Sequence, residues 1–100
     1  MDRRKIALEF SKSLDHPNIE KIILYGSVAR GEDDIDSDVD ILIVSNKKSE
    51  IKDIIMKRIG DILLDEDIYI SVKVITPSDY ENLINTHFIS TIEKEGVVIG

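Results

Sequence analysis

Residues 25–44, YGSVARGEDDIDSDVDILIV, contain the features that decide the fold. A short apolar run, residues 19–25, ends at a glycine, and a second apolar run begins near Asp38. Both runs are rich in β-branched residues, which favours buried strands. The segment after the glycine can begin a short helix, and a run of acidic residues follows it. The stretch therefore predicts two strands joined by a short helix and an acidic loop.

Amphipathic patterns lie on both sides of this stretch. Residues 4–14 place their apolar side chains on one face of a helix, and residues 49–64 repeat the same 3.6-residue pattern. Ser49 is the expected N-cap of the second helix. Residues 69–75 alternate between apolar and polar side chains, which predicts a third strand with one polar face.

The last quarter of the chain predicts another helix and a possible edge strand. Thr76 is an expected N-cap, followed by a proline at the first helical position. The side chains that this helix is expected to bury are Tyr80, Leu83, Ile84 and Phe88. A second helical turn around residues 89–92 follows, and residues 97–99 either add an edge strand or dock on a partner. This order of elements predicts an α/β (α+β) fold with a small mixed sheet flanked by helices.

Length and composition restrict the class of protein. One hundred residues, 42% of them hydrophobic and 33% charged, fit a single folded domain over residues 1–100. A net charge of −7 argues against general nucleic-acid binding. The absence of cysteine excludes disulfides, thiolate zinc sites and cysteine nucleophiles. We expect a cytoplasmic location and no membrane partner, since no apolar run is long enough to span a bilayer.

Gly26 and Ser27 follow the first strand directly. A glycine at this position allows the backbone to approach a ligand closely, and the Ser27 hydroxyl adds a hydrogen-bond donor. Taken alone, the pair is most often an ordinary turn at the end of a strand. The spacing to Gly31 is superficially that of a P-loop, but Glu32 stands where a phosphate-binding lysine is needed, so this is not a Walker motif.

Asp38 and Asp40 lie at the start of the second strand. Residues two apart on a strand point to the same side with Cα atoms about 6.5–7 Å apart. Carboxylates at that separation repel each other unless a cation lies between them, and hard oxygen ligands suit Mg²⁺. The alternative is a solvated acidic loop. Against it, Asp40 is followed at once by the apolar run Ile-Leu-Ile-Val, so it lies at the mouth of a buried strand.

Residues 26–32, GSVARGE, and residues 37–40, SDVD, together resemble the signature of the minimal nucleotidyltransferases of the DNA-polymerase-β-like superfamily. The resemblance implies a polymerase-β palm-like nucleotidyltransferase fold, a mixed sheet flanked by helices. It also implies Mg²⁺-dependent transfer of a nucleoside monophosphate, expected to be AMP, from an NTP to an acceptor hydroxyl. The expected NTP is ATP, and the acceptor can belong to a partner protein.

The same resemblance implies roles for individual residues. Gly26 and Ser27 would hold the β- and γ-phosphates of the nucleotide. Asp38 and Asp40 would be the catalytic carboxylates and would bind Mg²⁺, as one ion or as a two-metal site. Arg30 is a candidate phosphate partner, and an exposed arginine on a helix face is an equally good interpretation.

The sequence departs from the family pattern on the third strand. Family members that catalyse transfer carry a third carboxylate there, whereas this chain has Ser71 and Lys73 on the polar face. Lys73 is either a surface residue or lies near the acids and replaces part of a metal's charge. Asp65, Glu66 or Asp67 could supply the missing oxygen from the preceding segment. The sequence therefore predicts metal and nucleotide binding, whereas the third carboxylate found in family members that catalyse transfer is not identified.

Two functional hypotheses from different classes remain open. The first is an enzyme, a nucleotidyltransferase acting on an acceptor that the sequence does not identify. The second is an antitoxin-like, nucleotide-binding interaction module that neutralises a helical HEPN-domain partner with little or no catalysis. Small proteins that resemble this one often act as the antitoxin of such a partner, and in some of these pairs the antitoxin adenylylates the toxin. His87 is expected to be a packed or interface residue in either case, rather than a catalytic base.

Overall fold

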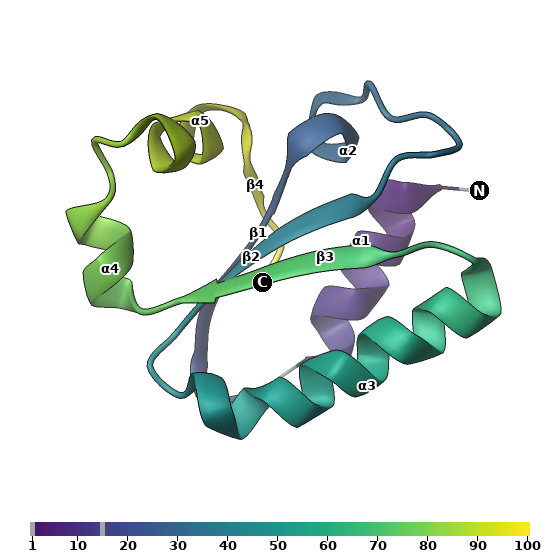
Figure 1. The fold of residues 1–100 in the computed structure, drawn as a ribbon, viewed down its shortest axis with the longest axis horizontal. Helices are drawn as coiled ribbons and strands as arrows, with labels where there is room; N and C mark the ends of the chain where they lie inside the picture. Colours follow the sequence, from purple (N-terminus) through teal and green to yellow (C-terminus); the bar gives the residue numbers. More distant parts are fainter. Residues whose placement is uncertain (1, 15) are drawn as a thin grey trace.

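The computed structural model describes residues 2–14 and 16–100, which form a four-stranded sheet with helices against it (Figure 1). Along the chain the elements are α1 (Arg3–Ser13), β1 (Ile19–Tyr25), α2 (Gly26–Arg30), β2 (Val39–Ser45), α3 (Lys48–Glu66), β3 (Ile70–Ile75), α4 (Pro77–Asn82), α5 (His87–Glu95) and β4 (Val97–Val98). The predicted small mixed sheet flanked by helices is confirmed.

The strands lie in the order β3-β2-β1-β4. Strand β1 pairs antiparallel with both β2 and β4, whereas β2 and β3 are parallel. Parallel neighbours need a long crossover connection, and α3 supplies it. Strand β2 therefore has a partner along both edges and is the most deeply buried strand, which explains its nearly continuous apolar sequence.

The two faces of the sheet carry separate apolar clusters. Successive residues of β2 belong to opposite clusters. Ile41 and Ile43 pack toward α1 and α3, while Leu42 and Val44 pack toward α4 and α5. The first cluster is the larger and includes the fully buried Phe10 of α1. In Figure 1, α1 and α3 lie on one side of the strands and α4 and α5 on the other. The second face is only partly covered, which leaves room for a site.

Helix α3 begins at Lys48, so the prediction of Ser49 as its N-cap is wrong. Lys47 occupies the cap position and makes no side-chain cap hydrogen bond. The hydroxyl of Ser45 instead accepts a hydrogen bond from the N–H of Lys47 at 3.0 Å, so a residue of the preceding strand closes this turn. None of the helices within the two described ranges combines the length and the apolar character needed to cross a bilayer.

The region after β3 forms two helices where one longer helix followed by a turn was expected. Thr76 is confirmed as an N-cap, since its hydroxyl accepts a hydrogen bond from the N–H of Asp79. The predicted burial of Leu83, Ile84 and Phe88 is wrong: their exposed fractions are 42%, 43% and 43%. The reason is that α4 stops at its second turn and Leu83 and Ile84 fall in the link before α5, off any helix face.

The edge-strand alternative for residues 97–99 is confirmed. Val97 and Val98 pair with β1, and the pairing continues beyond β4. The N–H of Ile99 donates to the carbonyl of Ile22 at 2.8 Å, and the N–H of Ile22 donates to the carbonyl of Gly100 at 2.8 Å. The last residues of the chain thereby cover the outer edge of β1.

Truncation of Ile43 to alanine should destabilise the protein by about 2–5 kcal/mol, because Ile43 is fully buried in the central strand and alanine leaves a cavity. The matched control is Ile35→Ala, which removes the same atoms from a side chain that is 87% exposed and should change stability by less than about 0.5 kcal/mol. Denaturant unfolding of both variants measures this difference, and equal midpoints would contradict the assignment of Ile43 to the core.

Candidate active site

Gly26 is held against Asp40 where β1 ends and α2 begins. Its φ of +76° is a backbone conformation that side-chain-bearing residues rarely adopt. A Cβ at this position would also collide with the Oδ2 atom of Asp40. Glycine is therefore required twice, once for the backbone angle and once for the close approach of the carboxylate. Ser27, the next residue, is half-buried.

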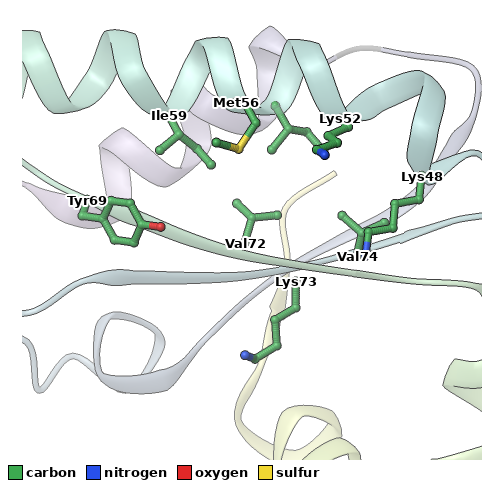
Figure 2. A pocket seen from close by; sticks show the side chains of 9 residues that line it. Lys48, Lys52, Met56, Ile59, Tyr69, Val72, Lys73 and Val74 are labelled. Atoms are coloured by element: carbon green, nitrogen blue, oxygen red, sulfur yellow. The ribbon is translucent and has the colours of Figure 1, made fainter.

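The strand register aligns a row of polar side chains across one face of the sheet. Asp40 is paired with Tyr25 of the antiparallel strand β1 and with Ser71 of the parallel strand β3. Lys73 lies two residues beyond Ser71 and so points to the same face. Figure 2 shows Lys73 directed away from the helix α3 side of β3. The face that carries Asp40 is thus the one that α4 and α5 cover only in part.

The charges in this row act on one another. The pKa of Asp40 is raised, first by burial and then by the negative charge of Asp38, while Lys73 and Arg30 lower it by smaller amounts. Burial and the Asp40 charge likewise raise the pKa of the Tyr25 hydroxyl. The shift of Asp40 means that its ionised carboxylate is held at an electrostatic cost, which a cation at this position would reduce.

Asp38 and Asp40 fit a magnesium ion. Both offer hard oxygen donors at the mouth of β2, with Asp38 exposed just before the strand and Asp40 half-buried at its second residue. Magnesium is commonly bound through one or two carboxylates, with waters and substrate phosphates as the other ligands. Within residues 2–14 and 16–100, no group of three or more His, Asp or Glu side chains is placed to hold a metal. Asp38 and Asp40 therefore match the one or two carboxylates through which magnesium is commonly held.

The alternative third carboxylates lie in a different part of the fold. Asp65 and Glu66 end α3, and Asp67 is its C-cap with a φ of +54°. Glu66 and Asp67 line a separate cavity of about 580 Å³ with Arg3 and Asp33, and neither predicted metal ligand lines it. Ser71 and Lys73 remain the polar side chains of β3 on the Asp40 face.

The guanidinium of Arg30 forms hydrogen bonds with two neighbouring carboxylates. Its Nε atom donates to Glu32 at 2.9 Å and its Nη1 atom donates to Glu95 at 3.2 Å, so the guanidinium links α2 to α5. These hydrogen bonds raise the pKa of Arg30. Because the pairs are exposed, they are weak enough to rearrange. The role of Arg30 as a phosphate partner stays a prediction.

Two cavities flank the sheet near these residues, and of the two only the smaller is lined by Gly26. The larger, about 470 Å³, lies between α3 and β3 and is lined by residues such as Lys52, Met56 and Tyr69 (Figure 2). It opens on the far side of β3 from the ammonium group of Lys73. The smaller, about 290 Å³, has Gly26 in its wall. The presence of Gly26 in its wall, rather than its volume, makes the smaller cavity a candidate part of the site.

Sequence reasoning missed the residues that α5 contributes to this smaller cavity. Phe88 was assigned to the core, but it is exposed and its ring meets that of Tyr25 edge to face, with centroids 5.8 Å apart at 87°. Of the two alternatives for His87, packing in the core is wrong, because His87 is exposed at the first residue of α5, whereas an interface role stays a prediction. The useful signal was Thr86: a second N-cap predicts a new helix, whose first turn then faces the end of β1.

Alanine at position 26 should destabilise the protein more than alanine at position 31, by about 1–3 kcal/mol. Both glycines have positive φ, +76° and +73°, so the backbone strain is matched, but only a Cβ at Gly26 meets Asp40. Adding Asp40→Ala to the Gly26→Ala variant should recover part of the loss in a double-mutant cycle followed by denaturant unfolding. Equal costs at the two glycines would show that the Asp40 contact imposes no constraint.

Asp40→Asn should raise the melting temperature at neutral pH in metal-free buffer. Because the pKa of Asp40 is raised in the folded protein, this group's stabilising contribution is present below its unfolded pKa and is lost as pH rises through the folded pKa. The gain should therefore shrink in acid. The control is Asp36→Asn in the exposed loop, which should change stability by less than about 0.5 kcal/mol. A melting temperature for Asp40→Asn below that of the wild type would contradict an electrostatic cost of ionised Asp40 in the folded protein.

Comparison with known proteins agrees with this geometry. Residues 4–99 match the family described as the nucleotidyltransferase domain. A curated relative, named a "putative protein adenylyltransferase", from Methanocaldococcus jannaschii is 35% identical over 104 residues. The aligned region covers 99% of this chain and 100% of that relative.

Solved structures share the fold at low sequence identity. A nucleotidyltransferase structure from Sulfolobus solfataricus, itself titled "putative", is 22% identical with a TM-score of 0.52, covering 94% of this chain and 76% of that one. A toxin–antitoxin structure with AMP-PNP is 15% identical with a TM-score of 0.56, covering 96% and 71%. A variant of the MntA–HpeT toxin–antitoxin is 14% identical with a TM-score of 0.55, covering 100% and 73%. The match over residues 4–99 and the 35% identity to the curated relative show that the chain belongs to the nucleotidyltransferase domain family.

Proposed function

We propose that this protein is a Mg²⁺-dependent nucleotidyltransferase that transfers AMP from ATP to an acceptor hydroxyl, with a partner protein as the acceptor. The observation that carries the proposal is the close approach of Gly26 to the carboxylate of Asp40, because Gly26 begins the turn to which the proposal assigns the phosphates. The name of the Methanocaldococcus relative and the AMP-PNP in one structural neighbour support the choice of nucleotide.

Each part of the site has one task in this reaction. Backbone N–H groups of the turn at Gly26 and the hydroxyl of Ser27 bind the β- and γ-phosphates and orient the triphosphate. Magnesium held by Asp38 and Asp40 would neutralise phosphate charge and orient the reacting groups. The ammonium of Lys73, on the same face, adds a positive charge where the family pattern has a third carboxylate.

The chemical step is a displacement at the α-phosphorus. The acceptor oxygen forms a bond to the α-phosphorus, and the bond from the α-phosphorus to the oxygen that bridges to the β-phosphorus breaks. Pyrophosphate leaves with that bridging oxygen, and the acceptor hydroxyl releases its proton. Such transfer depends on positioning and charge neutralisation, so loss of the two carboxylates should be severe.

Thermal unfolding with ATP, with and without Mg²⁺, tests the nucleotide site. ATP at 100 times its Kd should stabilise the fold by about 2.7 kcal/mol, a shift of roughly 4–8 °C at this size, only when Mg²⁺ is present. The shift should vanish in Asp38→Asn/Asp40→Asn and persist in Asp36→Asn/Asp53→Asn, which changes the charge equally at exposed positions. A shift that survives the first double substitution would overturn the assignment of these carboxylates.

A second function is favoured by one observation: two structural neighbours are toxin–antitoxin structures. Under this alternative the protein binds nucleotide but neutralises a helical HEPN-domain partner by binding alone. Growth of cells that co-express both proteins separates the two functions. The transfer proposal expects Asp38→Asn/Asp40→Asn to lose both neutralisation and label transfer from [α-³²P]ATP to the partner, whereas neutralisation that is unchanged without label transfer would favour binding alone.

A further inference from the structure

The cavity between α2 and α5 begins where the phosphate turn begins. Gly26 forms part of its wall, and the remaining walls come from the end of β1, from α2 and from the first turns of α5. Tyr25, Phe88 and Ile92 give it a mainly apolar lining. The Arg30–Glu95 ion pair, which joins the two helices, lies at its border. The cavity is therefore continuous with the turn at Gly26 and has the lining of a site for a flat, largely apolar group.

Phe88 is the side chain best placed to contact such a group. One edge-to-face contact with Tyr25 fixes its ring, and 43% of the side chain stays exposed. A fixed aromatic ring with a free surface offers a stacking platform at little cost in side-chain entropy. Stacking on an aromatic side chain is favourable for any nucleobase, because every base has a π-face.

The size of the cavity limits what can fill it. Its volume, about 290 Å³, is close to the lower limit of about 300 Å³ for ligand pockets. This is suitable for a nucleoside and too small for a larger group. The larger cavity between α3 and β3 is on the other side of the sheet, so a triphosphate bound at Gly26 cannot place its base there (Figure 2).

We propose that the cavity between α2 and α5 binds the nucleoside part of the NTP, with the base stacked on Phe88 and the triphosphate leading to the turn at Gly26. This inference rests on the proposed function, because it assumes that the turn holds the phosphates. It adds that the affinity for the NTP comes from two subsites, which are built on different helices and strands. The phosphate subsite is built from β1, α2 and β2, and the nucleoside subsite depends on α5.

Binding of two probes, ATP and inorganic triphosphate, measured by calorimetry in Mg²⁺, tests whether the two subsites are separate. ATP reaches both subsites, whereas inorganic triphosphate reaches only the turn at Gly26. Phe88→Ala should weaken ATP binding by roughly 5- to 150-fold, the loss of one stacked base, and leave triphosphate binding unchanged. Phe88→Tyr keeps a stacking ring and should restore ATP affinity. The matched control is Ile84→Ala, since Ile84 has the same exposed fraction, 43%, and lies outside the cavity.

Different outcomes contradict the two proposals separately. Wild-type protein that binds neither ATP nor triphosphate in Mg²⁺ overturns the proposed function, and the nucleoside subsite with it. Wild-type protein that binds both, with Phe88→Ala weakening both equally or neither, overturns the subsite alone. Should Phe88→Ala fail to fold, Phe88→Leu keeps an apolar contact with Tyr25 without an aromatic face and should show the same selective loss of ATP affinity.

Discussion

The close approach of Gly26 to the carboxylate of Asp40 is the constraint on which the rest of the site depends. It joins the end of β1 to the start of β2 at a position where a Cβ has no room. The strand register then determines what lies beside Asp40: an aromatic residue, Tyr25, on one side and a small polar residue, Ser71, on the other. The close approach and the register together place the glycine turn, Asp40 and the polar residue of β3 side by side on one face of the sheet.

Some residues of the candidate site are close together in the sequence and others are far apart. The first group could be predicted from the sequence, whereas the second could be predicted only in part. The stretch from the glycine turn to the acids lies within one β1-α2-β2 segment, so its motif could be read before the structure was known. The parallel pairing that places Ser71 beside Asp40 could be expected from the βαβ pattern, but the register could not. Ser49 failed as an N-cap because a hydroxyl from the preceding strand closes that turn instead.

The second sheet face was the harder one to predict. Apolar spacing predicts one longer buried helix followed by a turn after β3, whereas a break after α4 leaves Leu83, Ile84 and Phe88 exposed. Periodicity cannot reveal such a break, because it registers which residues are apolar and not what lies opposite them. The exposure of Phe88 matters most: α5 covers the second apolar cluster with Ile89 and Ile92, and with Phe88 it also forms one wall of the cavity that Gly26 lines.

The pairing of β1 with β4 has a consequence for the order in which the molecule assembles. Ile23 pairs with Val98, so this edge of the sheet and the α5 helix before it close over a very long loop, whereas β1, α2 and β2 are consecutive in the chain. Contacts distant in sequence incur a larger loop-closure entropy and tend to form late. We expect the glycine turn and the acid pair to assemble early in folding. The wall supplied by α5 should form last and be the first to open in local unfolding.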